Sequence, residues 1–400
     1  MSARFPASVP ARAERVSRAL ASLRGLAVGD ALGSQFFVPT NLSSLRRREL
    51  PPGHWQWTDD TEMAASVVAV LAAHGHIDQD ALAASFAEHH DFDRGYGPAV
   101  NRMLRLIRQE GGDWRQLAAS LFEGQGSWGN GGAMRVAPLG AWFADDPERA
   151  ADEAERSAEV THRHPEAVAG TRAVAAATAL VAATEPGRPE APERPADCLD
   201  DGPDEAAAGA PEVGAGTVDG PGPGAVGDPG VGTVGGSGDR ARSGAAGGSG
   251  ATGGRGGGTA GDRPGRGPDE ADGGPTAPLT PETLLARVQE LVPRSAVQAG
   301  LRRAADLLDY ADVGTVAAVL GCGRRTSTQD TVPFTLWAAA RNLGDYRAAF
   351  WTTASAGGDV DTTCAIVGGI VAAAGPGSAP PEEWQERTEP FPTWLLDAVR

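Results

Sequence analysis

The sequence of 400 residues contains no lysine, and all 35 of its basic residues are arginine. The absence excludes a Walker A lysine, a lysine that forms a Schiff base with its substrate, and a Ser-x-x-Lys nucleophile. Strand-like alternation of β-branched and polar residues is also nearly absent. Any chemistry that the protein carries out must use groups other than a lysine amine.

Cysteines and long apolar runs are scarce as well. The three cysteines, Cys198, Cys322 and Cys364, show no paired spacing, which favours a reduced cytoplasm. The longest apolar run, CAIVGGIVAAA from Cys364 to Ala374, is too short to cross a bilayer, and the N-terminal segment lacks the apolar core of a signal peptide. No basic stripe offers a surface for nucleic acid. We therefore expect a cytoplasmic protein with neither a membrane nor a nucleic acid as its partner.

Large apolar side chains are rare between residues 185 and 278, where Gly, Pro, Ala and acidic residues dominate. Such a segment cannot bury enough apolar surface to offset its conformational entropy, so we predict a disordered insertion. It contains 16 acidic residues and 7 arginines, a net charge of −9 out of −17 for the whole chain. The flanking segments, 14–184 and 279–400, together have roughly 300 residues, enough for one interrupted domain.

Helical periodicity dominates what is present. Apolar residues recur at spacings of three and four, as in Val16, Leu20 and Leu23. After the insertion, Thr280 at an N-cap and Pro281 at the first helical position predict a helix start. The predicted fold class is all-α, with Gly-bearing turns between short helices.

An oxygen-rich turn, WQWTDDTEM, stands directly before an apolar helical run. Asp59 as the N-cap and Glu62 three residues later fit a capping box, and their negative charge suits the helix dipole. This structural alternative explains those two carboxylates. It leaves Thr58, Asp60 and Thr61 without a role.

A second such turn, GGDVDTT, precedes another apolar run and contains Asp359, Asp361 and Thr362. An EF-hand calcium loop is excluded, because Cys364 stands where its glycine belongs and Ile370 where its bidentate glutamate belongs. A simple helix cap remains the structural alternative.

The two turns taken together favour a metal site. Each offers carboxylates and a threonine hydroxyl, and neither offers a histidine or a thiolate. Such hard oxygen ligands suit Mg²⁺ or Mn²⁺ and not structural zinc. Because several aspartates would repel one another strongly, we predict that a pair of divalent ions compensates their charge.

A glycine-rich turn, Gly129–Gly132, precedes a helix that we expect to start near Ala133. Backbone N–H groups in such a turn can hold phosphate oxygens, although most such turns are only tight turns. Arg135 could meet a phosphate, but pairing with a neighbouring acid is favoured.

The pair His162 and His164 has no third soft ligand nearby, which favours hydrogen bonding or substrate contact over a zinc site.

This set of motifs resembles the ADP-ribosylglycohydrolase family, which includes the dinitrogenase reductase-activating glycohydrolases. The matching segments are GLAVGDALGS (25–34), WTDDTEM (57–63), RGYGP (94–98), GNGGAMRVAPLG (129–140), THRHPEA (161–167) and GGDVDTTCAIVGGIVAAAG (357–375). They follow the family's order and span nearly the whole chain outside the insertion. As a set they are highly specific, which no single motif is.

The resemblance implies a single-domain orthogonal helical bundle whose central cleft holds two Mg²⁺ or Mn²⁺ ions. The implied metal ligands are Thr58, Asp59, Asp60, Asp359, Asp361 and Thr362. The implied catalytic residues are Asp59, Asp60 and Asp361. The implied substrate-binding residues are Gly129, Asn130, Gly131, Gly132 and His162, with the Gly-Asn-Gly turn beside the diphosphate and distal ribose of an ADP-ribosyl group.

The implied activity is hydrolysis of the N- or O-glycosidic bond that joins an ADP-ribosyl group to a protein side chain or a small acceptor. The ions would orient the ribose hydroxyls and a water molecule that attacks the anomeric carbon. The expected partners are therefore an ADP-ribosylated protein or a small molecule that contains ADP-ribose, and we expect a monomer.

The sequence departs from the family pattern after Gly33. Active members carry a glutamate a few residues later, as a mobile acidic gate over the metals, whereas Phe36 and Phe37 stand here. Gln35 is neutral and cannot replace a general base. A non-hydrolytic protein that binds ADP-ribose or a nucleotide on the same fold is therefore the alternative hypothesis.

Overall fold

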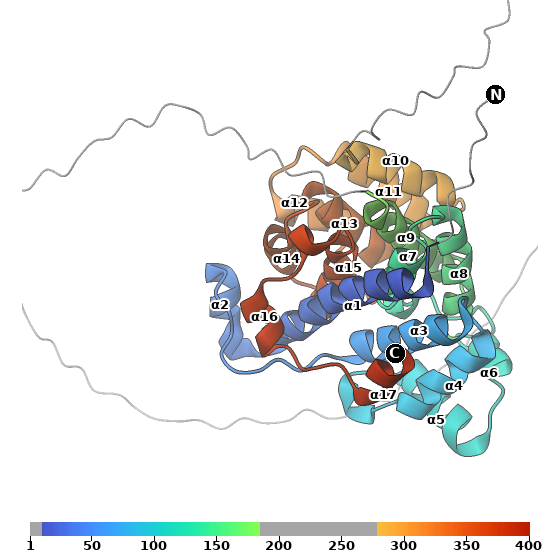
Figure 1. Ribbon diagram of the computed structural model, residues 1–400. Helices are drawn as coiled ribbons and strands as arrows, with labels where there is room; N and C mark the ends of the chain where they lie inside the picture. Colours follow the sequence, from blue (N-terminus) through green and yellow to red (C-terminus); the bar gives the residue numbers. More distant parts are fainter. Residues whose placement is uncertain (1–9, 185–277) are drawn as a thin grey trace, which may run out of the picture. The chain divides into compact units, whose positions relative to one another are not determined.

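The computed structural model describes residues 10–184 and 278–400 (Figure 1), which belong to one compact unit. The predicted disordered insertion lies outside the described residues, apart from Pro278. The boundaries proposed for the interrupted domain stay a prediction. No helix in the described ranges has the length and apolarity needed to span a membrane.

The described residues form seventeen α-helices and no strand, so the predicted all-α class is confirmed. Before the insertion these are α1 (Arg12–Ser34), α2 (Leu42–Arg47), α3 (Asp59–His74), α4 (Gln79–His89), α5 (Pro98–Glu110), α6 (Trp114–Ser120), α7 (Ala137–Trp142), α8 (Pro147–Glu159) and α9 (Pro165–Ala182). After it come α10 (Pro281–Leu291), α11 (Ala296–Asp306), α12 (Val313–Leu320), α13 (Thr328–Arg341), α14 (Tyr346–Ala354), α15 (Val360–Ala372), α16 (Glu382–Arg387) and α17 (Thr393–Ala398).

Short 3₁₀ turns link several of these helices. They are η1 (Gln35–Phe37), η2 (Pro39–Asn41), η3 (Phe92–Arg94), η4 (Asn130–Gly132) and η5 (Pro376–Ser378). Many helices begin where an Asp, Ser or Thr side chain accepts a free backbone N–H. The helix start predicted at Thr280 is confirmed, since its hydroxyl accepts the N–H of Thr283 at 3.2 Å.

Helices α1 and α15 form the centre of the fold, with α3 along the other side of α1 (Figure 1). Three glycines four residues apart, Gly25, Gly29 and Gly33, let the two backbones approach closely. A Cβ atom at Gly29 would lie 2.2 Å from the carbonyl oxygen of Cys364, far inside van der Waals contact. The glycine face, which meets α15 from Val360 to Ala372, therefore fixes how closely α1 packs along that helix.

The C-terminal segment fixes the loop that leads into α3. Trp55 is fully buried, and its backbone exchanges hydrogen bonds with Arg387 and Glu389. The Glu389 carboxylate accepts two hydrogen bonds from the guanidinium of Arg94, at 2.7 and 2.8 Å. Arg94 also donates to the carbonyl oxygen of Trp57 at 2.9 Å and lies 3.7 Å over its ring. These contacts hold the first acidic turn in place from two distant parts of the chain.

Candidate metal centre

Three aspartates from three helices converge at the centre of the bundle. Asp30 lies on α1, Asp60 in the first turn of α3, and Asp361 in the first turn of α15. One carboxylate oxygen from each lies within 4.8 Å of the others. The two acidic turns of the sequence, some 300 residues apart, thus meet at one point, as the metal-site hypothesis requires.

Asp30 is a member of this cluster that the sequence argument missed. Its carboxylate accepts the backbone N–H and hydroxyl of Thr58 at 2.9 and 2.8 Å. It also accepts the N–H and hydroxyl of Thr61 at 3.2 and 2.6 Å. The signal that was available is a lone aspartate within the apolar, glycine-rich helix GLAVGDALG. Asp30 therefore anchors the start of α3 and gives Thr61 the role that it lacked.

The capping box suggested for the first turn is wrong. The N-cap of α3 is Thr58 and not Asp59, since the Thr58 hydroxyl accepts the N–H of Asp60 at 3.4 Å. Glu62 turns away from the helix start and accepts the hydroxyl of Tyr96 at 2.7 Å and the N–H of Asp91 at 3.1 Å. Capping thus leaves the carboxylates of Asp59 and Asp60 unexplained.

The second acidic turn is also more than a cap. Asp359 stands at the N-cap of α15, yet its side chain makes no capping hydrogen bond. Its carboxylate accepts the amide of Asn130 at 2.7 Å instead. The hydroxyl of Thr362 lies 3.3 Å from both carboxylate oxygens of Asp60 and so joins the two turns.

Burial raises the pKa of Asp30, Asp59, Asp60, Asp359 and Asp361, and repulsion from other acids adds to it for all of them except Asp30. Burial, opposed by hydrogen bonds from Thr61 and Thr58, raises the pKa of Asp30 to about 6. Burial and then the charge of Asp30 raise the pKa of Asp59 to about 8. The same two causes hold the pKa of Asp60 well above its ordinary value. Burial, with weaker repulsion from other acids, raises the pKa values of Asp359 and Asp361.

Among the residues that the structure describes, these aspartates have no positive partner. Within residues 10–184 and 278–400, no arginine or histidine forms an ion pair with any of the five. Buried carboxylates are stable only when they are protonated, paired with cations or bound to metal. The donor set is all oxygen, which fits Mg²⁺ or Mn²⁺.

The glycine-rich turn lies against the second acidic turn through Asn130, whose amide contacts Asp359. It forms η4 and does not enter a helix near Ala133 as predicted. Helix α7 begins at Ala137, because Asn130 already accepts the N–H groups of residues 133 and 134 and Pro138 suits a first helical turn. The turn is thus a compact loop and not a helix N-terminus.

His162 packs against this loop. A Cβ atom at Gly131 would lie 2.7 Å from Cε1 of the His162 ring, so the close fit requires glycine. Burial, with the charge of Arg135, lowers the pKa of His162 to about 3, so the ring is neutral. Its Nδ1 lies 2.7 Å from the hydroxyl of Thr161, which leaves Nε2 for another partner.

His164 and Arg135 do not join the site. His164 is the N-cap of α9, and its Nδ1 accepts the N–H of Glu166 at 3.1 Å. The expected pairing of Arg135 with an acid is wrong, since it is fully buried and donates to the carbonyl oxygen of Ser157 at 2.7 Å. Its guanidinium also lies 4.6 Å over the ring of Phe86.

No carboxylate occupies the turn that follows α1. Phe36 is buried against Phe350 and Trp351, with ring centroids 6.4 and 6.1 Å away. The side chain of Phe37 is 52% exposed. An apolar core contact and an exposed aromatic ring thus stand where the family resemblance expects a glutamate.

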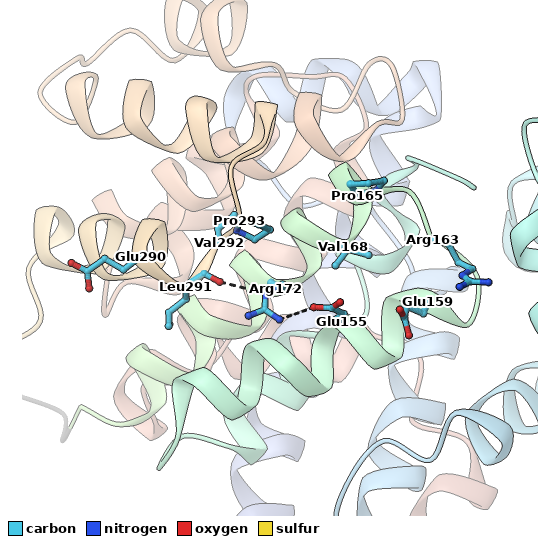
Figure 2. Close-up of a pocket in the computed structure, with 10 residues that line it drawn as sticks. All are labelled: Glu155, Glu159, Arg163, Pro165, Val168, Arg172, Glu290, Leu291, Val292 and Pro293. Carbon is cyan, nitrogen blue, oxygen red and sulfur yellow. Dashed lines mark hydrogen bonds and ion pairs between the residues drawn. The ribbon is translucent and has the colours of Figure 1, made fainter. Parts of the chain in front are cut away.

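A separate cavity of about 630 Å³ lies along α8, α9 and α10 (Figure 2). Figure 2 shows that Arg172 donates hydrogen bonds to the Glu155 carboxylate and to the carbonyl oxygen of Leu291. Their lengths are 2.7 and 3.4 Å. The charge of Arg172 is thus already paired, and none of the predicted site residues lines the cavity.

Comparison with known proteins identifies relatives. A sequence model of the ADP-ribosylglycohydrolase family matches residues 11–228 and 269–400. ADP-ribosylhydrolase ARH3 of Gallus gallus is 37% identical over 143 residues, which are 31% of this chain and 39% of the relative. ADP-ribosyl-[dinitrogen reductase] glycohydrolase of Rhodospirillum rubrum is 32% identical over 161 residues, which are 37% of this chain and 52% of the relative.

The chain therefore matches about two fifths to one half of the length of these curated relatives. A solved structure described as an ADP-ribosylglycohydrolase-related protein complex aligns with a TM-score of 0.52 and 19% identity. The alignment covers 96% of this chain and 95% of that one. At this identity the likeness shows the shared fold alone.

Proposed function

Because the chain belongs to the ADP-ribosylglycohydrolase family, we propose that it is a metal-dependent hydrolase that releases ADP-ribose from a protein side chain or a small acceptor. The bond cleaved is the N- or O-glycosidic bond at the distal ribose. The observation that carries the proposal is the group of buried and half-buried aspartates with no cationic partner among the described residues. A protein that only needed helix caps would not gather this much negative charge in its core.

The ligands of two divalent ions would come from both acidic turns. They are Thr58, Asp59 and Asp60 on one side and Asp359, Asp361 and Thr362 on the other. We assign Asp30 a different role, because its carboxylate accepts four hydrogen bonds from Thr58 and Thr61, three at Oδ2 and one at Oδ1. It is a positioning residue that orients the first turn. When bound, Mg²⁺ or Mn²⁺ would supply neutralising charge and Lewis acidity.

The substrate's diphosphate and distal ribose would lie along the loop Gly129–Gly132. Two contacts support this choice. Asn130 joins the loop to Asp359, and the neutral ring of His162 packs against Gly131. With its Nδ1 engaged by Thr161, His162 can donate a hydrogen bond from Nε2 to a ribose hydroxyl or a phosphate oxygen.

An aromatic pair beside this loop suits the adenine ring. Phe122 is 45% exposed, and its ring centroid lies 4.7 Å from that of Trp128. Trp128 directly precedes the loop, and its carbonyl oxygen accepts the N–H of Thr328 at 3.0 Å. Stacking of a base on such a platform contributes about 1–3 kcal/mol. Sequence reasoning had not singled out this pair.

Hydrolysis breaks the bond between the anomeric carbon and the acceptor atom and forms a new bond to a water oxygen, through an oxocarbenium-like transition state. The water loses a proton and the leaving acceptor gains one. Since no carboxylate stands at residues 35–37, the group that receives the water's proton would come from Asp59, Asp60 or Asp361. Of these three residues, Asp60 is buried, whereas Asp59 and Asp361 are half-buried.

The test is an assay of ADP-ribose release from ADP-ribosylated arginine, ADP-ribosylated serine and O-acetyl-ADP-ribose, with Mg²⁺, Mn²⁺ or a chelator. We expect metal-dependent release from at least one substrate, and its loss in Asp59→Ala and Asp361→Ala. The exposed ring of Phe37 favours a second candidate, a non-hydrolytic ADP-ribose-binding protein. No release, together with metal-dependent ADP-ribose binding in calorimetry, would establish the binding protein instead.

A further inference from the structure

A second cavity, of about 510 Å³, adjoins the metal centre and has a different chemistry. It lies among α11, α12, the start of α13 and the loop between α12 and α13. Three of its lining residues are Arg303, Arg324 and Arg325. We propose that this cavity binds a phosphate group additional to the diphosphate of ADP-ribose. The proposal rests on the proposed function for the nucleotide that would carry this phosphate.

The loop that bears Arg324 and Arg325 is a wall shared by the cavity and the proposed active site. On one side of the two arginines, the carbonyl oxygen of Cys322 accepts the N–H of Asp359 at 3.1 Å. On the other side, the carbonyl oxygen of Thr326 accepts the N–H of Asn130 at 3.1 Å. The arginines thus stand between a backbone contact to the second acidic turn and one to the proposed diphosphate loop.

The loop's path is fixed by close contacts. A Cβ atom at Gly323 would lie 2.4 Å from the Cβ atom of Asp359, and Gly323 has a φ of 82°. Thr326 also has a left-handed backbone, with a φ of 48°, which few residues other than glycine adopt. The backbone that carries Arg324 and Arg325 is therefore held against the second acidic turn.

The cavity carries more positive charge than the described residues neutralise. In the parts of the chain that the structure describes, the guanidinium groups of Arg303, Arg324 and Arg325 form no ion pair. One acid, Asp330, lines the same cavity, and its carboxylate accepts the N–H of Arg325 at 2.9 Å. The three arginines therefore exceed the acidic charge of the cavity by two.

Guanidinium groups bind phosphate and carboxylate alike through paired N–H donors. The excess of two positive charges matches the charge of a phosphate monoester, about −1.5 to −2 at pH 7, better than that of a single carboxylate or a neutral group. The phosphate could be a monoester on the nucleotide, for example on the adenosine ribose, or free inorganic phosphate. The distal ribose is excluded as the carrier, because it must face the aspartates for cleavage.

The experiment compares the calorimetric affinities of ADP-ribose and ADP-ribose 2′-phosphate for the full chain at fixed Mg²⁺ and salt. We expect the additional phosphate to tighten binding about tenfold, the effect of a single good charged contact. In the double variant Arg324→Gln/Arg325→Gln this affinity ratio should fall close to one. Arg102→Gln, an exposed arginine on α5, is the matched control and should keep the tenfold ratio.

If the wild type binds the two nucleotides with nearly equal affinity, the claim that the nucleotide carries the additional phosphate is wrong. If the double variant keeps the tenfold affinity ratio, the assignment of the phosphate to this cavity is wrong. A second arm titrates inorganic phosphate alone and follows the ³¹P resonance. Broadening that the double variant abolishes identifies a site for free phosphate. If ADP-ribose itself does not bind, the proposed function fails. The titration with inorganic phosphate still tests the cavity, because an unbroadened ³¹P resonance would show that it binds no phosphate.

Discussion

Removing divalent cations should make the stability of this protein fall as the pH rises. Asp30 and Asp59 are carboxyl groups whose pKa values in the folded protein are raised, to about 6 and about 8. Without metal, the folded state therefore binds more protons than the unfolded state. The stabilisation is fully present below the unfolded pKa of about 4 and is lost as the pH rises through the folded values.

The size of the expected loss of stability can be worked out from Asp30 alone. A shift from the ordinary value of 3.8 to about 6 corresponds to about 3 kcal/mol at 1.36 kcal/mol per pKa unit. For roughly 300 folded residues, such a loss lowers Tm by about 5 °C. Because the pKa of Asp59 is about 8, the fall in stability continues toward pH 8. Bound metal replaces the protons, so a saturating cation at 1,000 times its Kd should restore about 4 kcal/mol.

The assay is thermal unfolding at pH 5, 6, 7 and 8 with EDTA, with Mg²⁺ and with Mn²⁺. We expect Tm to fall with pH in EDTA and to recover with metal, most strongly at pH 8. Asp60→Asn should reduce the slope of the metal-free Tm against pH. Asp312 is an exposed helix cap whose pKa is lowered by Thr315, so Asp312→Asn should leave this slope unchanged between pH 5 and 8. A metal-free Tm that is flat or rises over this range would refute the reasoning.

Three further predictions concern single positions. Gly29→Ala should destabilise the fold by more than about 3 kcal/mol in chemical denaturation, because its Cβ atom would overlap a backbone carbonyl of α15, whereas Gly97→Ala should be nearly neutral, since its Cβ atom meets nothing within 4 Å. Phe122→Ala should weaken ADP-ribose binding by about 1–3 kcal/mol in calorimetry, and Phe92→Ala, also exposed, should not. Asn130→Ala should weaken metal binding by about 10–100-fold in a metal titration, since its amide orients the Asp359 carboxylate, and an unchanged affinity would contradict that role.

The helical class and the two acidic turns could be predicted because they are local patterns. Apolar spacing of three and four gives helices, and carboxylates beside threonine hydroxyls are visible without any tertiary structure. The meeting of Asp60 with Asp361 was predicted from the chemical similarity of their turns and not from any contact. The close approach of α1 and α15 that permits it depends on glycines spaced by four, a pattern that many helices share.

Asp30 could not be identified in this way. Its role depends on Thr58 and Thr61, which reach it only after α3 packs along α1. The same packing makes Thr58 the N-cap in place of Asp59, because the extended backbone at Thr58 lets its hydroxyl accept an N–H of the first turn. The later start of α7 was missed because the acceptor role of Asn130 is not visible in the sequence.

The central claim is tested most directly by the rate of ADP-ribose release from the three ADP-ribosylated substrates, measured for the wild type and Asp361→Ala with and without Mg²⁺ or Mn²⁺. The account predicts release from at least one substrate by the wild type, abolished both by EDTA and by the substitution. Release that persists in EDTA or in Asp361→Ala would contradict the metal centre, and no release from any substrate would contradict the proposed hydrolase.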